Sequence, residues 1–130
     1  MKIGIVGLGD FSDDFVRLFK LHPDVEEVVV ADLDSDRVKV SMQKHGIKRG
    51  FNSFEDLLQN APDVDSIGIF TQRHLHGPMI VKALEMGKHV YSAVPIGCTI
   101  EEIEKIIDLV KKTRLIYMMG ETCYYYPCAI

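Results

Sequence analysis

Near its amino terminus the chain reads Ile3-Gly-Ile-Val-Gly-Leu-Gly-Asp-Phe-Ser12. The β-branched run predicts a strand that leads directly into the turn Gly7-x-Gly9-x-x-Ser12. Glycines in such a turn leave room for a pyrophosphate to approach backbone N–H groups at the start of a helix, where the helix dipole favours negative charge. The third glycine position of this motif normally lets the helix and strand pack closely. Here it holds the small Ser12 in place of glycine or alanine.

A second apolar run, residues 28–31, ends at Asp32. Asp32 lies slightly more than about 20 positions after the glycine turn. In dinucleotide-binding domains, a carboxylate at about this spacing accepts hydrogen bonds from the adenosine ribose hydroxyls. A glycine pair after an apolar run can also be a simple turn. The strand before it, the helical pattern after it and Asp32 at the end of the next strand favour dinucleotide binding.

The composition fits one α/β domain, because the 130 residues are 47% hydrophobic and 26% charged. A net charge of −4 gives no general reason to expect a nucleic acid or an anionic membrane as partner. Met1-Lys2 precedes a run that reaches glycine at once, and no stretch is long enough to cross a bilayer. We therefore expect a cytoplasmic protein without a secretory segment.

The three cysteines, Cys98, Cys123 and Cys128, are too few and too odd in number for a disulfide framework. Cys123 and Cys128 lack a second pair of ligands at zinc-site spacing. We expect free thiols in a reducing compartment, and no metal site.

Strand and helix patterns alternate along the chain without a break in composition. Strands are expected at 3–6, 28–31, 66–70, 88–91 and 115–119. Helices are expected before Pro23, from Asp34 or Ser35 to His45-Gly46, after Ser53, with Pro78 in the first turn before Gly87, and after Thr99. The pattern predicts one doubly wound parallel sheet of about six strands, a Rossmann fold with helices on both faces.

Three further segments carry a family resemblance: Thr71-Gln-Arg-His-Leu-His76, Ala83-Leu-Glu-Met-Gly-Lys-His-Val90 and Pro95. Together with the glycine turn and Asp32, they resemble the nucleotide-binding half of the glucose-fructose oxidoreductase, inositol dehydrogenase and MocA (Gfo/Idh/MocA) family over essentially the whole chain. The resemblance implies an NAD- or NADP-dependent oxidoreductase acting on a sugar, cyclitol or related polyol or keto substrate. It also implies that residues 1–130 are a fragment lacking a C-terminal substrate domain, with little turnover alone.

Carried over by position, the resemblance implies pyrophosphate contacts from Gly7, Leu8, Gly9, Asp10, Phe11 and Ser12. Asp32 would bind the adenosine ribose, and Thr71 would line the cofactor crevice. Family members commonly have Pro-Asn where this chain has Gln72-Arg73. His76 matches the motif histidine, which either contacts the cofactor or begins the following helix and bonds locally.

The chain departs from the family at Val94, because Ser92-Ala-Val-Pro95 replaces the usual Cys-Glu-Lys-Pro. Valine can neither carry charge nor relay a proton, so the catalytic residue is unknown. The protein uses another acid or base, has a different substrate chemistry, or binds the cofactor without catalysis.

Replacement acids and bases are offered by Glu121 and the tyrosines 124–126, which follow the last strand. A tyrosine cluster more often packs or forms an interface than donates a proton. Lys88 and His89 lie within a strand, where an architectural role is favoured over chemistry.

The expected cofactor is NAD, because Asp32 suits a free ribose 2′-hydroxyl and its charge, with that of Asp34, opposes the 2′-phosphate of NADP. Arg37 weakens this preference if its guanidinium reaches a phosphate rather than solvent.

A noncatalytic NAD(H)-sensing or scaffold module is the alternative function, motivated by Val94. A methyltransferase using S-adenosylmethionine is disfavoured by the pattern from Thr71 to Pro95. A homo-oligomer is possible, although no residue pattern establishes one.

Overall fold

The apolar runs of the sequence form a parallel sheet in the computed structural model, which describes residues 1–129. The strands follow the order β3-β2-β1-β4-β5-β6 and every neighbouring pair is parallel. Their bounds are β1 (Lys2–Val6), β2 (Glu27–Ala31), β3 (Gly50–Phe51), β4 (Ser66–Ile69), β5 (His89–Ala93) and β6 (Tyr117–Gly120). The predicted doubly wound sheet is confirmed. Strand β3 has only two residues, too few for a recognisable sequence pattern.

The helices begin and end mostly where the sequence placed their caps. They are α1 (Asp10–Leu21), α2 (Ser35–His45), α3 (Phe54–Asn60), α4 (Arg73–Glu85) and α5 (Ile100–Thr113), followed by the 3₁₀ turns η1 (Thr122–Tyr125) and η2 (Pro127–Ala129). The side chains of Asp34, Ser53 and Thr99 accept hydrogen bonds from first-turn N–H groups of α2, α3 and α5. Gly46 ends α2 in the left-handed conformation, with φ 62°.

Helix α4 begins earlier than predicted. Pro78 was expected in the first turn, but the helix starts at Arg73 and Pro78 lies inside it. The Leu75 N–H already donates to the Gln72 carbonyl at 2.8 Å, which forms a turn before the proline. A proline here removes the helical bond to the carbonyl of His74, and both residues are exposed, so water can pair with that carbonyl.

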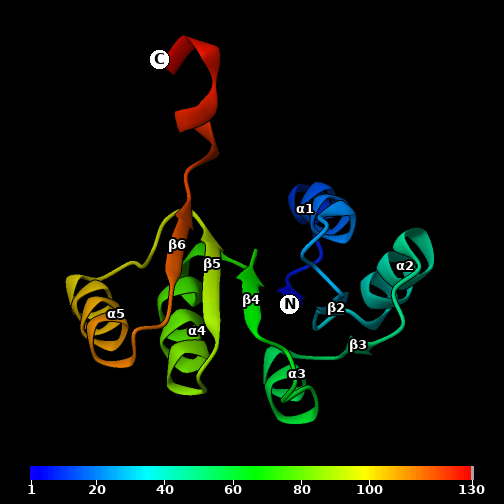
Figure 1. Cartoon of the computed structure of the whole chain (residues 1–130), viewed down its shortest axis with the longest axis horizontal. Helices are drawn as coiled ribbons and strands as arrows, with labels where there is room; N and C mark the ends of the chain where they lie inside the picture. Colours follow the sequence, from blue (N-terminus) through cyan, green and yellow to red (C-terminus); the bar gives the residue numbers. More distant parts are fainter. Residues whose placement is uncertain (130) are drawn as a thin grey trace.

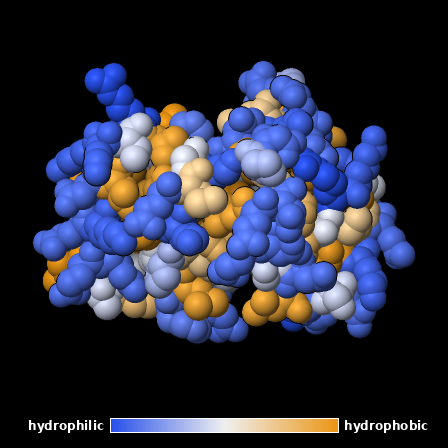
Figure 2. All heavy atoms as spheres, turned by 90° about the horizontal axis from the view of Figure 1, so that it is seen from below, coloured by the Kyte–Doolittle hydropathy of each residue, from blue (hydrophilic) through white to orange (hydrophobic). Residues whose placement is uncertain are grey.

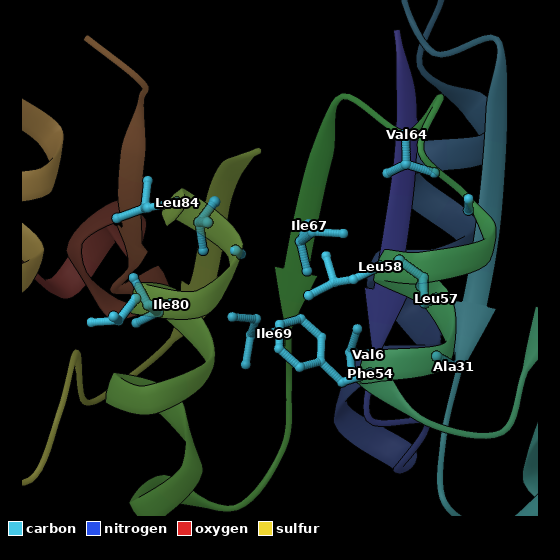
Figure 3. Packing of buried hydrophobic residues seen from close by; sticks show 14 of the residues in the cluster. Val6, Ala31, Phe54, Leu57, Leu58, Val64, Ile67, Ile69, Ile80 and Leu84 are labelled. Atoms are coloured by element: carbon cyan, nitrogen blue, oxygen red, sulfur yellow. The ribbon is translucent and has the colours of Figure 1, made fainter. Parts of the chain in front are cut away.

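The strand residues alternate between two buried clusters, which is why both faces of the sheet carry helices. Ile3, Ile5, Val28 and Val30 pack with Val16 of α1 and with α2. On the other face, strands β1, β2, β4 and β5 pack against α3, α4 and α5. Figure 3 shows Phe54, Leu57 and Leu58 of α3 and Ile80 and Leu84 of α4 gathered around Ile67 and Ile69 of β4. Figure 1 shows the resulting layers.

An ion-pair network lies at the edge where the strands begin. Arg49 donates to Glu27 at 2.8 Å and to Asp63 at 3.0 Å, and the Lys2 ammonium donates to Asp63 at 2.7 Å. These hydrogen bonds, first from Arg49 and then from Lys2, hold the pKa of Asp63 well below its usual range. The network ties β1 and β2 to the segments that precede β3 and β4.

The Lys88 side chain has an architectural contact, as the sequence indicated. Its ammonium is buried and donates to the carbonyls of Pro62 and Val64, both at 2.7 Å. It therefore satisfies two backbone acceptors beneath the loop that leads into β4.

Segments η1 and η2 extend away from the sheet beyond the end of β6 (Figure 1). Seen from below relative to Figure 1, hydrophilic residues cover most of the surface, with apolar residues scattered between them (Figure 2). Within residues 1–129, each helix is too short or too polar to span a membrane.

We expect Lys88→Met to lower the free energy of unfolding by about 2–3 kcal/mol, because it leaves the buried Val64 carbonyl and the partly buried Pro62 carbonyl without this donor. Urea denaturation measures this loss. Lys39→Met removes only an exposed pair with Asp36 and should change stability by no more than about 0.5 kcal/mol. Equal losses in the two variants would contradict the role assigned to Lys88.

Acidification should destabilise the protein partly through Asp63. A carboxyl group whose folded pKa is depressed stabilises the fold above its unfolded pKa of about 3.9, and this contribution is lost as the pH falls through the folded value. Below about pH 4, the free energy of unfolding should therefore fall less steeply in Asp63→Asn than in the wild type. Asp24→Asn, in an exposed loop, is the control and should follow the wild-type slope.

Candidate functional site

A crevice of about 790 Å³ opens where the carboxyl ends of β1, β2 and β4 meet. The chain leaves β1 towards β2 on one side, and β4 lies on the other, so this is the point where the strand order reverses. Open parallel sheets bind ligands at such a point. Five of the residues proposed from the sequence line the crevice: Gly7, Leu8, Gly9, Asp32 and Thr71.

Gly7 is required by the fold itself. Its φ of +89° disfavours any residue with a side chain, and a Cβ atom would lie 2.7 Å from the carbonyl carbon and oxygen of Phe70. Those atoms are backbone and cannot turn aside. The turn after β1 therefore lies directly against the chain leaving β4.

Gly9 faces open space. A Cβ atom there would meet nothing closer than the Arg37 guanidinium, 4.0 Å away. Gly9 is also the N-cap of α1. Its carbonyl accepts from the Ser12 N–H at 3.1 Å, but it offers no side chain to the other first-turn N–H groups. The free volume and the uncapped helix start fit an anionic group such as a pyrophosphate.

The Asp32 carboxylate links the two loops that form one wall of the crevice. One oxygen accepts from the Leu8 N–H at 2.6 Å, and the other accepts from the Asp34 N–H at 2.9 Å. The side chain is thereby held at the end of β2, and each oxygen keeps a second lone pair for a ligand hydroxyl.

Arg37, whose reach was open from the sequence, lines the crevice. Its Nε lies 3.6 Å from the Asp34 carboxylate, and more than half of each side chain is exposed. The guanidinium therefore lies beside the Asp34 carboxylate and close to Gly9 of the glycine turn.

The remaining residues of the turn lie just outside the crevice. Asp10 and Ser12 line a neighbouring hollow between α1 and α2. Ser12 is buried, and its hydroxyl donates to the Gly9 carbonyl at 2.8 Å, which stiffens the turn. Phe11 packs against Phe15 and Phe70 with tilted rings, whose centroids lie 5.2 and 6.1 Å away.

The same hollow contains Asp13, which joins α1 to α2. Its carboxylate bonds to the Lys44 ammonium and to the His45 ring, each at 2.7 Å. These two hydrogen bonds, Lys44 first, lower the pKa of Asp13.

On the opposite wall, Thr71 is followed by Gln72, Arg73 and His74, all of which line the crevice. His76 does not line it. The His76 ring is buried behind Thr71, and both of its nitrogens lie within hydrogen-bond distance of backbone carbonyls. The structure therefore supports the local bonding that the sequence left open for this residue.

Sequence reasoning missed several apolar lining residues, including Leu33, Phe54, Phe70 and Met79. Leu33 and Phe70 had a usable signal, since Phe70 directly follows the end of β4 and Leu33 follows Asp32, the first residue after β2. Phe54 and Met79 lie on helices and carry no such signal.

The residues considered as replacements for the family lysine lie outside the crevice. Among the described residues, neither Val94 nor Glu121 nor any of the tyrosines 124–126 lines the crevice. Glu121 accepts from the Cys123 N–H, and Tyr124 and Tyr125 stack edge to face at 5.4 Å. His89 accepts from the Ile116 N–H at 2.9 Å, an architectural contact.

The part of the chain that the structure describes contains no group of three or more His, Cys, Asp or Glu side chains suited to a metal ion. All three cysteines are exposed free thiols.

Comparison with known proteins gives a family match over residues 1–121, to the oxidoreductases with an NAD-binding Rossmann fold. The chain is 34% identical to a glycosyl hydrolase family 109 protein of Porphyromonas gingivalis, over 96% of this chain and 28% of that protein. It is 30% identical to a bovine trans-1,2-dihydrobenzene-1,2-diol dehydrogenase, over 98% of this chain and 38% of that one.

A similar solved structure is that of scyllo-inositol dehydrogenase from Lactobacillus casei with bound NAD(H) and scyllo-inositol. It superposes with a TM-score of 0.88 at 27% identity, and the match covers 98% of this chain and 38% of the dehydrogenase. The chain thus spans less than two fifths of the length of each of these relatives.

The two glycines of the turn should respond differently to alanine. Gly9→Ala adds a methyl group to free space, so the melting temperature should stay close to the wild type while NAD(H) affinity falls at least about tenfold. Gly7→Ala strains the backbone and collides with Phe70, so it should cost about 2 kcal/mol or more in stability.

Calorimetric titration with NADH and urea denaturation distinguish the two effects. Undiminished NADH binding by Gly9→Ala would show that no ligand group approaches the turn at this position.

Proposed function

The chain belongs to the Gfo/Idh/MocA oxidoreductase family as its NAD-binding Rossmann domain, and from this we propose that it binds NAD(H) in the crevice for hydride transfer to or from a sugar, cyclitol or related polyol or keto substrate. The observation that carries the proposal is the combination of free space over Gly9 with the Asp32 carboxylate held at the neighbouring strand end. This pairing matches the two polar parts of a dinucleotide, a pyrophosphate and a ribose diol.

Each wall of the crevice has its own role in this proposal. The turn Gly7–Gly9 and the start of α1 hold the pyrophosphate, and Asp10, Phe11 and Ser12 shape and support that turn. Asp32 accepts from the adenosine ribose. Thr71 forms the wall opposite the glycine turn, and His76 acts from behind it.

Asp32 also accounts for a preference for NAD over NADP. A 2′-phosphate would lie against a carboxylate whose oxygens already accept from two backbone N–H groups, and Asp34 adds a second negative charge nearby. Arg37 offsets part of this repulsion, because its guanidinium lines the same crevice. We therefore propose NAD as the preferred cofactor, with a weaker affinity for NADP.

The nicotinamide of the bound cofactor supplies hydride donation or acceptance, and the chain must add a proton donor or acceptor near the substrate. Val94 cannot serve, and the described residues that line the crevice include no lysine. We propose that residues 1–130 work with a substrate domain that supplies this group and encloses the substrate. The short coverage of the relatives supports this division.

The proposed substrate class is supported by the relatives' names: a scyllo-inositol dehydrogenase, a dihydrodiol dehydrogenase and a glycosyl hydrolase family 109 protein. The compounds that these names indicate share a carbon skeleton with adjacent hydroxyl groups or glycosidic oxygens. We also propose that the protein works in a reducing compartment such as the cytoplasm, because its three cysteines are unpaired. A homo-oligomer is compatible with this proposal. Nucleic acid is not among the proposed partners, since the net charge is −4.

A noncatalytic NAD(H)-sensing module is the second candidate, favoured by valine at the lysine position. Substrate-dependent NADH oxidation by the longer parent chain would support the enzyme. Ligand-controlled partner binding without turnover would support the sensor. Steady NADH-dependent turnover of a polyol or keto sugar by residues 1–130 alone would contradict the need for a second domain.

Thermal unfolding with NAD, NADH, NADP, NADPH and S-adenosylmethionine tests the cofactor assignment. NAD(H) at 100 times its dissociation constant should stabilise the wild type by about 2.7 kcal/mol, with smaller shifts from NADP(H) and none from S-adenosylmethionine. Asp32→Asn keeps an oxygen for the Leu8 N–H but removes the charge, so the ratio of NAD to NADP affinity should fall about tenfold.

Asp36→Asn is the matched control, because Asp36 is exposed on the same loop-to-helix segment and pairs only with Lys39. It should retain the wild-type ratio. Absence of any nucleotide-induced shift in the wild type at millimolar concentration would contradict NAD(H) binding by this domain.

A further inference from the structure

The Arg37 side chain reaches from the first turn of α2 back towards the glycine turn. Its terminal nitrogen Nη1 lies 4.0 Å from the position that a Cβ atom would take on Gly9, and it is the nearest atom around that position outside the turn. Arg37 also lines both the crevice and the neighbouring hollow between α1 and α2. The guanidinium therefore lies on the border between the two, next to the free space over Gly9.

The Asp34 carboxylate determines which edge of the guanidinium faces that space. One of its oxygens accepts from the N–H groups of Asp36 and Arg37 at 2.9 and 3.3 Å and caps α2. The other lies 3.6 Å from the Nε atom of Arg37. Because Nε faces Asp34, the two terminal nitrogens remain for a further acceptor. Their parallel N–H groups match two oxygens of a phosphate.

The ion pair with Asp34 is weak enough to leave Arg37 available to a ligand. More than half of each side chain is exposed, and ion pairs between exposed side chains contribute little to stability. A diphosphate carries more negative charge than one carboxylate, so it competes well for the guanidinium. Binding a ligand at the terminal nitrogens also does not require Nε to leave Asp34.

The neighbouring lysines of α2 are already bonded to carboxylates. The Lys44 ammonium donates to Asp13 at 2.7 Å, and the Lys39 ammonium donates to Asp36 at 3.2 Å. Arg37 is therefore the cation of this helix best placed to meet a ligand anion at the glycine turn.

Two phosphate groups of a dinucleotide could be the partner of Arg37: the pyrophosphate, or the 2′-phosphate that distinguishes NADP from NAD. A 2′-phosphate would lie beside Asp32, where the adenosine ribose is expected. Among the described residues, the ion pairs include Arg37 with Asp34 but not Arg37 with Asp32. Hydrogen bonds from N–H to oxygen are about 2.9 Å long. An oxygen that fills the space over Gly9 thus comes within reach of Nη1 after a small side-chain movement.

We propose that Arg37 binds the pyrophosphate of the cofactor from α2, opposite the backbone N–H groups of the glycine turn, and that it does not select between NAD and NADP. This rests on the proposed function, since the crevice is the NAD(H) site. The contact suits any adenosine diphosphate ester, including ADP-ribose. Attraction between Arg37 and a 2′-phosphate acts across solvent and is screened by salt, so selection between the two cofactors depends mainly on Asp32.

The proposal is tested with Arg37→Gln by calorimetric titration with NADH, NADPH and ADP-ribose. We expect all three affinities to fall about tenfold, because one charge-assisted contact common to the three ligands is lost. The ratio of NADH to NADPH affinity should change by less than about threefold. Adenosine has no phosphate, and its binding, followed by NMR titration, should be unchanged. Arg37→Lys keeps the charge without the paired donors and should recover part of the lost affinity.

Arg17→Gln is the matched control. Arg17 is exposed on α1 and lies 3.5 Å from the carboxylate of Asp14, three positions earlier, as Arg37 lies 3.6 Å from that of Asp34. Arg17 lines neither the crevice nor the hollow. The control should keep wild-type affinity for every ligand, and both glutamine variants should keep a melting temperature close to the wild type.

Two results would overturn the role of Arg37 while leaving the proposed function intact. One is wild-type NADH and ADP-ribose affinity in Arg37→Gln. The other is a tenfold loss of NADPH affinity with unchanged NADH affinity, which would make Arg37 a residue that recognises the 2′-phosphate. A wild-type chain that binds no NADH would instead overturn the proposed function and this proposal together.

Discussion

The close approach of the Gly7 backbone to the chain leaving β4 is the constraint on which the site depends. Gly7 donates its N–H to Ala31 at the end of β2, and Phe70 donates to Val6 at the end of β1. The next residue, Leu8, bonds to Asp32. Three strand ends are thereby joined around one residue without a side chain. A larger residue would separate β1 from β4, and the crevice between them would lose its floor.

The two edges of the sheet are stabilised in different ways. At the edge where strands begin, Lys2, Glu27, Arg49 and Asp63 pair their charges with one another, and Lys88 satisfies two carbonyls. At the carboxyl edge, polar groups are held by the backbone but keep capacity for a ligand, as at Asp32 and at the uncapped start of α1. Such a division places stability and binding on opposite edges, which is typical of parallel α/β sheets.

Sequence reasoning located the glycine turn, Asp32, Thr71 and three helix caps, because each of these depends on a residue type at a fixed distance from a strand or helix end. It was wrong about the start of α4, where the turn from Gln72 to Leu75 begins the helix ahead of Pro78. It also could not place the residues after β6. Glu121 and the tyrosines 124–126 follow the last strand, yet η1 carries them away from the crevice that the other strand ends form.

What the amino-acid sequence determined by itself is the set of local geometries: strand, turn, cap and the residue types that a dinucleotide needs. These arise from neighbours within a few positions, and short-range sterics and hydrogen bonding specify them. Only the tertiary structure decided which of those pieces face one another. The Thr71 and Pro95 carbonyls meet at one imidazole because α4 packs back between β4 and β5, and Gly9 stays open because nothing from another element fills the space above it. Such distances depend on the packing of whole helices against the sheet, and no local pattern encodes them.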